Sequence, residues 1–209
     1  VSSIAAYRGA PGLSIGNAVG SNIANIALVL GLAVLVNPLK VNKHLVHKEL
    51  PLLILLMVAA GGLVWDRELG RIDGIVLLGG LFGLIGWIVW DGLRSREIPE
   101  GLEDELPGEM KTTTALLWVL VGLAVLLGSS ELLVWGAKSI ARSFGVTERV
   151  IGLTVVAFGT SLPELAATVV AAKRNEHDIA VGNIVGSNMF NTLGVLGLPG
   201  VIRPGAVED

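Results

Sequence analysis

Long apolar runs separated by short polar stretches dominate the pattern of this 209-residue chain. A helix that crosses a membrane needs roughly 20 mostly apolar residues, and six runs approach or exceed that length: 13–36, 50–65, 73–92, 114–137, 150–172 and 179–202. The second run is short, so we expect its helix to begin earlier, near His47. The pattern predicts an all-α integral membrane protein with about six spans and an N-terminal helix stub.

The first and last runs are copies of one another. Residues 14–41 (SIGNAVGSNIANIALVLGLAVLVNPLKV) and 180–207 (AVGNIVGSNMFNTLGVLGLPGVIRPGAV) share 13 of 28 positions at an offset of 166. The identities include the polar pairs Gly16/Gly182, Asn17/Asn183, Gly20/Gly186, Ser21/Ser187, Asn22/Asn188 and Asn25/Asn191. We expect both repeated helices to be discontinuous, and broken helices that carry amide and hydroxyl groups at bilayer depth indicate ion coordination at a repeat interface.

The two copies are expected to run in opposite directions. The polar links at 8–12 and 173–178 occupy equivalent repeat positions, and five spans separate them, which places them on opposite membrane faces. Lysine and arginine are divided almost equally between the faces, so the side that each link occupies stays open. We predict a first half at 1–92, an acidic linker at 93–113 and a second half at 114–209, in a chain cut at both ends.

Composition narrows the possible functions. The chain is 52% hydrophobic and 16% charged, has a mean hydropathy of +0.72, and contains 28 glycines. It has no cysteine, which excludes disulfides and thiolate metal sites. A net charge of −3 argues against nucleic acid as a partner. We therefore expect the lipid bilayer to be the surroundings of this protein.

Chemistry concentrates in the fifth run, whose segment 150–165 reads VIGLTVVAFGTSLPEL. Gly159 and Pro163 interrupt a helix there, because proline supplies no N–H and clashes with the preceding turn. Four positions three or four residues apart share one helix face and offer hydroxyl, carboxylate and carbonyl oxygens: Ala157, Thr160, Ser161 and Glu164. Matching oxygen pairs at i, i+4 lie on the repeated runs: Ser187 with Asn191, and Ser21 with Asn25.

All these candidate ligands are hard oxygen donors, which favour Ca²⁺ or Na⁺ over zinc or copper. A carboxylate at the bilayer centre costs at least about 2.5 kcal/mol unless it is paired. Glu164 therefore needs a cation, a proton or a polar partner. The small and amide residues taken singly also fit close helix packing and interhelical hydrogen bonding.

These motifs resemble a known family. GTSLPEL at 159–165, GNIVGSN at 182–188 and GNAVGSNIAN at 16–25 are similar to the two alpha repeats of the sodium/calcium exchanger branch of the calcium/cation antiporter superfamily, with the closest likeness to bacterial and archaeal exchangers. The resemblance implies a ten-helix inverted-repeat antiporter in a plasma (inner) membrane, with a monomeric transport unit and no cofactor. It also implies that Na⁺ and Ca²⁺ are carried in opposite directions through midplane oxygen sites by alternating access.

The resemblance assigns ligands residue by residue. It makes Thr160, Ser161 and Glu164 ion ligands, with the Ala157 carbonyl helping to bind Na⁺, and it adds Ser187, Ser21 and Asn25. Asn191 stands where some relatives carry aspartate, which lowers the negative charge and argues against K⁺ cotransport. The acidic counterpart of Glu164 would precede Val1, so we expect the isolated chain to bind Ca²⁺ weakly or not at all.

Other functions remain possible for this sequence. The same fold could exchange H⁺ for Ca²⁺ or another cation, with Glu164 titrating. An intramembrane enzyme with Ser161 or Thr160 as nucleophile needs a nearby base, and the spans place no histidine or lysine beside these hydroxyls. Three kinds of residue are weaker candidates: Glu131 as a proton relay or crevice residue, His44 and His47 as metal ligands or members of a solvated basic loop, and His177 as a short-loop residue.

Overall fold

The computed structural model describes residues 7, 11–95, 111–145 and 157–206. This part of the chain consists of helices joined by short turns and connections, with one pair of two-residue strands. In chain order, with η marking π-helix, the elements are α2 (Pro11–Ala24), η1 (Asn25–Leu30), α3 (Gly31–Val36), η2 (Leu45–Glu49), α4 (Leu50–Leu63), β1 (Glu68–Leu69), α5 (Arg71–Ser95), α6 (Thr112–Ser143), α8 (Ala157–Thr160), α9 (Leu162–Lys173), α10 (His177–Phe190), η4 (Asn191–Val195), α11 (Leu196–Ile202) and β2 (Gly205–Ala206).

Five helical runs in the described residues are long and apolar enough to cross a membrane: Ile15–Val36, Leu45–Leu63, Arg71–Arg94, Thr112–Ser129 and His177–Ile202. They correspond to five of the six predicted spans, and the second begins at Leu45, which confirms the earlier start. The predicted span 150–172 begins outside the described residues, and its described part forms α8 and α9. The division at 93–113 remains a prediction, since residues 96–110 also lie outside.

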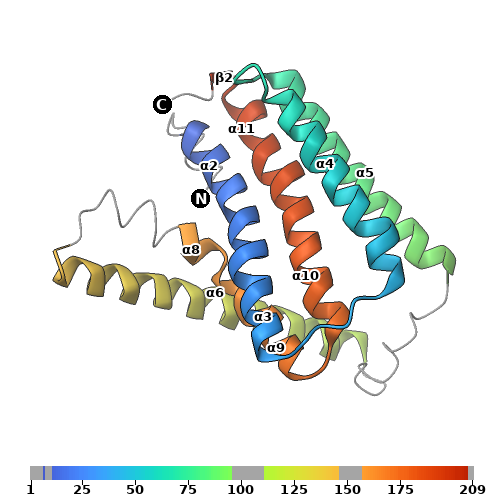
Figure 1. The fold of residues 1–209 in the computed structure, drawn as a ribbon, viewed down its shortest axis with the longest axis vertical. Helices are drawn as coiled ribbons and strands as arrows, with labels where there is room; N and C mark the ends of the chain where they lie inside the picture. The colour runs from blue at the N-terminus through green and yellow to red at the C-terminus, as the bar shows by residue number, and fades with distance from the viewer. Residues whose placement is uncertain (1–6, 8–10, 96–110, 146–156, 207–209) are drawn as a thin grey trace.

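The two repeats run antiparallel through the centre of the bundle. In Figure 1 the helix from α2 to α3 descends beside the helix that rises from α10 to α11. Their hydrogen bonds agree, because Asn22 pairs with Thr192 whereas the later residue Asn25 pairs with the earlier residue Asn188. The predicted inversion of the repeats is confirmed.

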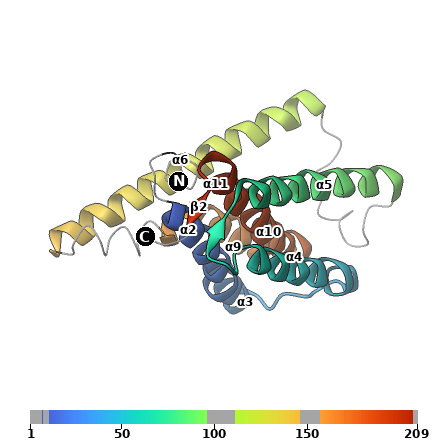
Figure 2. The same ribbon diagram turned by 90° about the horizontal axis from the view of Figure 1, so that it is seen from above.

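Helix α11 lies between α2 and α5 (Figure 2) and approaches α5 very closely. A Cβ atom built on Gly74 of α5 would lie 2.6 Å from the Val201 backbone nitrogen and 2.7 Å from the Gly197 carbonyl oxygen. A Cβ atom on Gly200 would lie 2.9 Å from the Gly70 carbonyl oxygen. Small residues allow such backbone contact between membrane helices, so glycine sets the distance between these two helices.

Packing around this contact forms the main apolar core. Its buried members come from α2, α4, β1, α5, η4 and α11: Ile15, Ala18, Ala60, Leu69, Leu77, Leu81, Leu193 and Leu196. Beside it, β1 pairs with β2 in antiparallel register, Glu68 with Ala206 and Leu69 with Gly205. The strand pair joins the α4–α5 turn to the segment after α11, a link that the apolar pattern does not predict.

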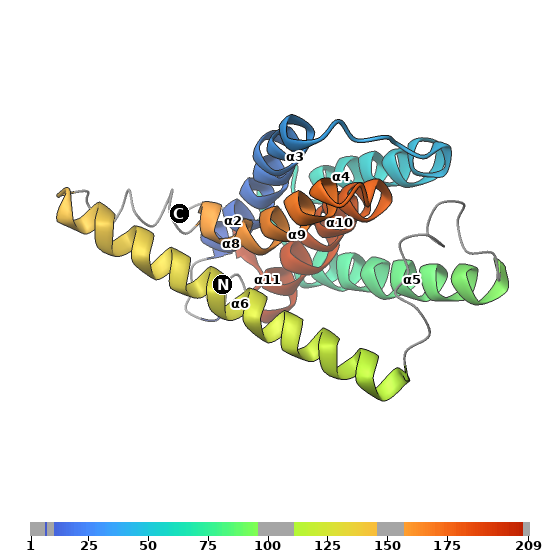
Figure 3. The ribbon, with the colours of Figure 1, turned by 90° about the horizontal axis from the view of Figure 1, so that it is seen from below.

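Helix α6 crosses the other helices at a steep angle, along one side of the bundle (Figures 1 and 3). It touches mainly α8 and α9. Its large apolar side chains stay exposed, among them Leu116, Trp118, Leu127 and Trp135. Exposed apolar surface of this extent suits a lipid environment rather than water. The protein is a multi-pass integral membrane protein.

One end of the antiparallel pair is held by amide side chains. Asn37, directly after α3, donates from Nδ2 to the Ala172 carbonyl oxygen at 2.8 Å and to Asn175 Oδ1 at 2.9 Å. Asn175 occupies the left-handed region, with φ of 64°, in the turn between α9 and α10. Asparagine tolerates that backbone conformation better than most residues. This turn therefore fixes the end of the first repeat against the second.

Candidate functional site

The repeats meet at four buried polar side chains. Asn25 Nδ2 donates to Asn188 Oδ1 at 3.0 Å, and Asn22 Nδ2 donates to Thr192 Oγ1 at 3.0 Å. Asn25 lies near the middle of the span Ile15–Val36, and Asn188 lies near the middle of His177–Ile202. Polar groups at that depth have no water to bond, so they must bind one another or a ligand. The repeat crossing is therefore polar where the membrane is most apolar.

Both repeats contain a π-helical segment that starts at the same repeat position. Segment η1 begins at Asn25 and η4 begins at Asn191, which are separated by the repeat offset of 166. The backbone stays helical through Ala24 and Phe190, so these two helices are not broken, contrary to expectation. A π segment inserts a wider turn without interrupting the helix, and such segments are frequent at functional sites.

The fifth predicted span is broken as expected. Helix α8 ends at Thr160, Ser161 occupies a turn with φ of −97° and ψ of 2°, and α9 begins at Leu162. Pro163 stands in the first turn of α9, where a missing N–H costs least. Because the break falls at Ser161, the predicted oxygen stripe does not lie along one continuous helix. Thr160 nevertheless reaches the first repeat, with its Oγ1 3.2 Å from Ser21 Oγ.

Several oxygens at this meeting of the two halves are buried and have no hydrogen-bond partner in the described part of the chain. They are Glu164 Oε2, Ser161 Oγ, Asn25 Oδ1 and Asn22 Oδ1. Ser161 is 2% exposed and Asn25 is 1% exposed. A buried oxygen without a donor is costly, and a cation can supply the missing interaction. The donor set of carboxylate, hydroxyl and amide oxygens matches a hard cation such as Na⁺ or Ca²⁺.

Asn183 holds the backbone of Glu164. Its Nδ2 group donates to the Glu164 carbonyl oxygen at 3.2 Å and to Thr168 Oγ1 at 2.9 Å. Thr168 is fully buried one turn further along α9. The amide therefore joins α10 to the turn of α9 that carries Glu164.

The remaining predicted ligands lie on the expected elements. Ser187 is half-buried on α10, and Asn191 is half-buried at the first position of η4. Ala157 begins α8, and its side chain is outside the described residues. The structure brings Ser21 to Thr160 and Asn25 to Asn188.

Some polar residues of the site escaped the sequence interpretation. The repeat had marked Asn22, Asn188 and Asn183 as identities, and that signal could have found them. Thr192 carried no such signal, because Ile26 stands at its position in the first repeat. Thr192 accepts the Asn22 hydrogen bond only because the two helices cross at this point.

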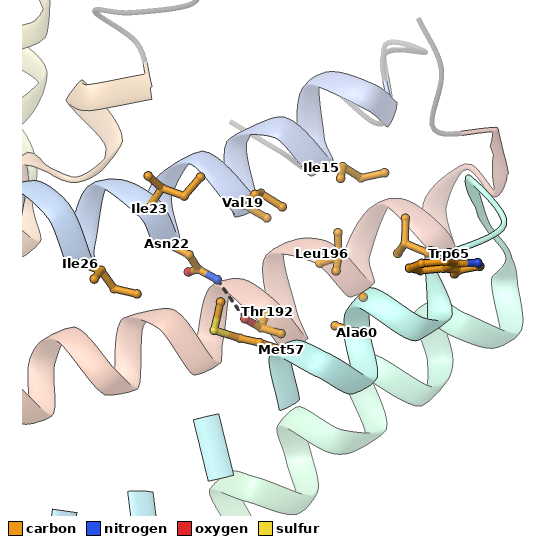
Figure 4. A pocket seen from close by; sticks show the side chains of 13 residues that line it. Ile15, Val19, Asn22, Ile23, Ile26, Met57, Ala60, Trp65, Thr192 and Leu196 are labelled. Atoms are coloured by element: carbon orange, nitrogen blue, oxygen red, sulfur yellow. Dashed lines mark hydrogen bonds between the residues drawn. The ribbon is translucent and has the colours of Figure 1, made fainter. Parts of the chain in front are cut away.

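Asn22 and Thr192 also face a cavity of about 520 Å³ between α2, α4 and the helix from η4 to α11. Figure 4 shows their hydrogen bond at its wall, with Met57 beside it. The other lining residues are mostly apolar: Ile15, Ala18, Val19, Ile23, Ile26, Ala60, Gly61, Val64, Trp65 and Leu196. The polar crossing thus has an apolar cavity on this side.

The three histidines among the weaker candidates have contacts away from this site or begin a helix. His44 and His47 lie on a helix rather than in a loop, His44 with Nδ1 3.6 Å from Glu49 Oε1 and His47 with Nδ1 2.8 Å from the Lys43 carbonyl oxygen. The predicted loop is wrong because π-helix η2 extends the second span towards the N-terminus. His177 begins α10 instead of lying in a loop. The side chain of Glu131 lies outside the described residues.

Two other kinds of site, a cluster of metal-ligating side chains and an activated serine, are not seen in the described residues. Within 7, 11–95, 111–145 and 157–206, no three histidine, cysteine, aspartate or glutamate side chains gather as a metal site. Ser161 Oγ has no hydrogen-bond partner there, so no base activates it.

Two antiparallel repeats, a broken helix against them and midplane oxygens define an inverted-repeat membrane transporter core. The family model described as "Sodium/calcium exchanger protein" matches residues 1–90 and 114–209. The chain belongs to the sodium/calcium exchanger family, a family of transporters and not of enzymes.

Individual relatives agree with this assignment. The putative antiporter CaxA of Alkalimonas amylolytica is 43% identical over 211 residues, which cover 100% of this chain and 66% of CaxA. The inner membrane protein YrbG of Escherichia coli (strain K12) is 40% identical over 204 residues, 94% of this chain and 62% of YrbG. A solved structure of the sodium-calcium exchanger NCX_Mj, soaked with zero Na⁺ and Ca²⁺, superposes with a TM-score of 0.83 at 37% identity, over 99% of this chain and 66% of that one. The chain thus spans slightly less than two thirds of the length of these relatives.

Proposed function

We propose that this protein is a secondary active antiporter that exchanges Na⁺ for Ca²⁺ across a membrane. The observation that carries the proposal is a set of buried oxygens, on the first repeat and on the broken helix, that have no hydrogen-bond donor among the described residues: Glu164 Oε2, Ser161 Oγ and Asn25 Oδ1. Oxygen atoms that lack donors in a membrane interior favour a bound cation. The relatives named as a putative antiporter and as a sodium-calcium exchanger support the same function.

The proposed ligands come from both repeats and from the broken helix. Glu164 supplies negative charge, and neutral oxygens come from Thr160, Ser161, Ser187, Asn191, Ser21, Asn25 and the Ala157 carbonyl. Because Na⁺ and Ca²⁺ have similar radii, a flexible oxygen site can take either and discriminates by total charge and ligand number. Competition for overlapping sites then couples the two fluxes.

Alternating access requires two states that bind the ions differently. An ion shifts the inward- and outward-facing populations only by the difference in its affinity for them. Helix α6 touches mainly α8 and α9, so the proposed moving element is α6, with the hydrogen bonds between the repeats kept in both states. We place the protein in a prokaryotic inner membrane, by analogy with YrbG, with one polypeptide as the transport unit.

A second candidate is exchange of H⁺ for Ca²⁺ by the same site. Glu164 Oε2 is buried and has no partner within the described ranges, and a proton satisfies a lone carboxylate oxygen as well as a cation does. In that case Glu164 binds a proton on one side of the membrane and Ca²⁺ on the other.

The deciding experiment measures ⁴⁵Ca²⁺ uptake into proteoliposomes that contain the full-length protein, with an outward Na⁺ gradient or a pH gradient applied separately. We expect uptake with the Na⁺ gradient and its loss in Glu164→Gln. The matched control is Glu176→Gln, which changes a carboxylate in the α9–α10 turn near Arg174 and should leave uptake unchanged. Uptake driven only by the pH gradient would move the function to H⁺ exchange, and no uptake with either gradient would overturn both.

A further inference from the structure

Four side chains form a connected bridge between the repeats at mid-membrane. Asn22 and Asn25 lie one turn apart on the first repeat, and Asn188 and Thr192 lie one turn apart on the second. Their exposed fractions are 6%, 1%, 0% and 4%, in that order. We propose that Asn22, Asn188 and Thr192 are positioning residues that hold Asn25 with its oxygen towards the ion, an inference that rests on the proposed function.

The direction of the Asn22 bond is fixed by Thr192. The threonine hydroxyl has one hydrogen, and it is donated to the Asn188 carbonyl oxygen at 2.8 Å. Thr192 Oγ1 can therefore only accept from Asn22, which must present its Nδ2 group. Asn22 is held in one orientation and anchors the first repeat to the turn that carries Asn188.

Asn188 gives Asn25 the orientation that a ligand needs. An amide can bind a cation only through its oxygen, so its NH₂ group must be held elsewhere. Asn25 Nδ2 donates to Asn188 Oδ1 at 3.0 Å, and Asn25 Oδ1 is left buried with no donor in the part of the chain that the structure describes. If the Asn25 amide turned over, its NH₂ group would face the cation. Asn188 Oδ1 thus holds the NH₂ end of Asn25, and Asn188 Nδ2 is itself buried with no acceptor in the described residues.

The arrangement is not symmetric, although the repeats are. The symmetric counterpart of the bond from Asn25 to Asn188 would run from Asn191 to Asn22. Asn22 Oδ1 has no donor in the described residues, and the Asn22 amide donates to Thr192 instead. The bridge therefore orients the amide of the first repeat and leaves Asn191 outside it. Of the two equivalent amide ligands, Asn25 is therefore oriented by a hydrogen bond across the repeats, whereas Asn191 is not part of this bridge.

A double-mutant cycle on the full-length protein tests this role. The Michaelis constant for Ca²⁺ in gradient-driven uptake is measured for Asn188→Leu in the native background and in an Asn25→Asp background. Aspartate has an oxygen at both ends, so it needs no orientation. We expect Asn188→Leu to raise KM about tenfold in the native background and less than about twofold with Asn25→Asp, because interacting residues are non-additive.

Two further variants separate positioning from packing. Asn188→Asp keeps an acceptor for Asn25 Nδ2, and its KM should stay within about threefold of the native value, the size of a modest hydrogen-bond change. The matched control is Asn37→Leu, which removes another amide bridge between the repeats and should alter thermal stability without raising KM. If Asn188→Leu does not fold, Thr192→Val replaces it in the cycle, since it removes the acceptor for Asn22.

Each outcome decides the proposal. An equal rise in KM in both backgrounds, or an Asn188→Asp variant as impaired as Asn188→Leu, would overturn the positioning role and leave the exchanger function intact. If the native protein transports with a pH gradient only, the same cycle is measured with that gradient. Absence of uptake under either gradient would overturn both the exchange function and the positioning role.

Discussion

Ser21 and Thr160 are 139 positions apart in the sequence, yet their hydroxyl oxygens lie 3.2 Å from one another. Ser21 belongs to the first repeat, and Thr160 is the last residue of α8, directly before the helix break. This contact places the broken helix against the polar turn of the opposite repeat. The candidate site therefore exists only where the two halves of the chain meet.

Replacing Ser21 should weaken cation binding more than it weakens the fold. We expect Ser21→Ala to raise the KM for Ca²⁺ about three- to tenfold, the range for loss of one hydrogen-bonding oxygen. Initial rates of ⁴⁵Ca²⁺ uptake into proteoliposomes measure this change. The control is Ser129→Ala, whose hydroxyl donates to the Leu126 carbonyl oxygen on the exposed side of α6. Equal losses in the two variants would contradict a specific role for Ser21.

The close approach of α5 and α11 predicts a large difference between two glycines of one helix. Gly74→Ala places a Cβ atom against the backbone of α11 and should cost about 1–3 kcal/mol of stability, as overpacking does. Gly79→Ala meets nothing within 4 Å and should be neutral or stabilising by up to about 1 kcal/mol through helix propensity. Thermal unfolding in detergent measures both, and equal midpoints would refute the contact.

Replacing Asn183 should lower the stability of the protein more than replacing its partner Thr168. Asn183→Leu removes both bonds to α9, and Thr168→Val removes only one of them. We expect a stability loss of about 1–3 kcal/mol for the first variant and about half of it for the second, as for buried groups that lose partners. Because the Glu164 backbone is released, Asn183→Leu should also raise the KM for Ca²⁺. A larger stability loss in Thr168→Val than in Asn183→Leu would show that the Thr168 hydroxyl makes other stabilising interactions.

The charge at Asn191 should control ion preference. Asn191→Asp adds a carboxylate to a site whose other proposed carboxylate is Glu164, and more ligand charge favours a divalent ion. We expect a lower KM for Ca²⁺ and a higher Na⁺ concentration for half-maximal inhibition of Ca²⁺ uptake. Competition between ²²Na⁺ and Ca²⁺ in proteoliposomes measures this. The control Asn37→Asp places the same charge outside the site, beside Asn175, and a similar shift there would indicate a surface-charge effect.

Much of the fold could be predicted from the sequence. The apolar runs located five spans that the structure describes, and the duplicated motif predicted the inverted crossing. Pro163 predicted the broken helix. These features depend on hydrophobicity over a whole span or on the chemistry of one residue, and both are visible in the sequence.

The details of the site could not be predicted in the same way. The π segments at Asn25 and Asn191 shift the hydrogen-bond register within continuous helices, and the apolar pattern barely changes when that happens. Lys43 and His44 are helical directly before the second span, where a basic loop was predicted because charged residues usually mark loops.

The sequence by itself determined that the protein is helical, crosses the membrane several times, contains an inverted repeat and carries oxygen ligands suited to a hard cation. Only the tertiary structure decided which oxygens face one another: Ser21 with Thr160, and Asn25 with Asn188 rather than with its repeat mate Asn191. These pairs join segments more than 130 positions apart. They depend on the angle and register at which two helices cross, which the glycine contacts and the polar crossing set together.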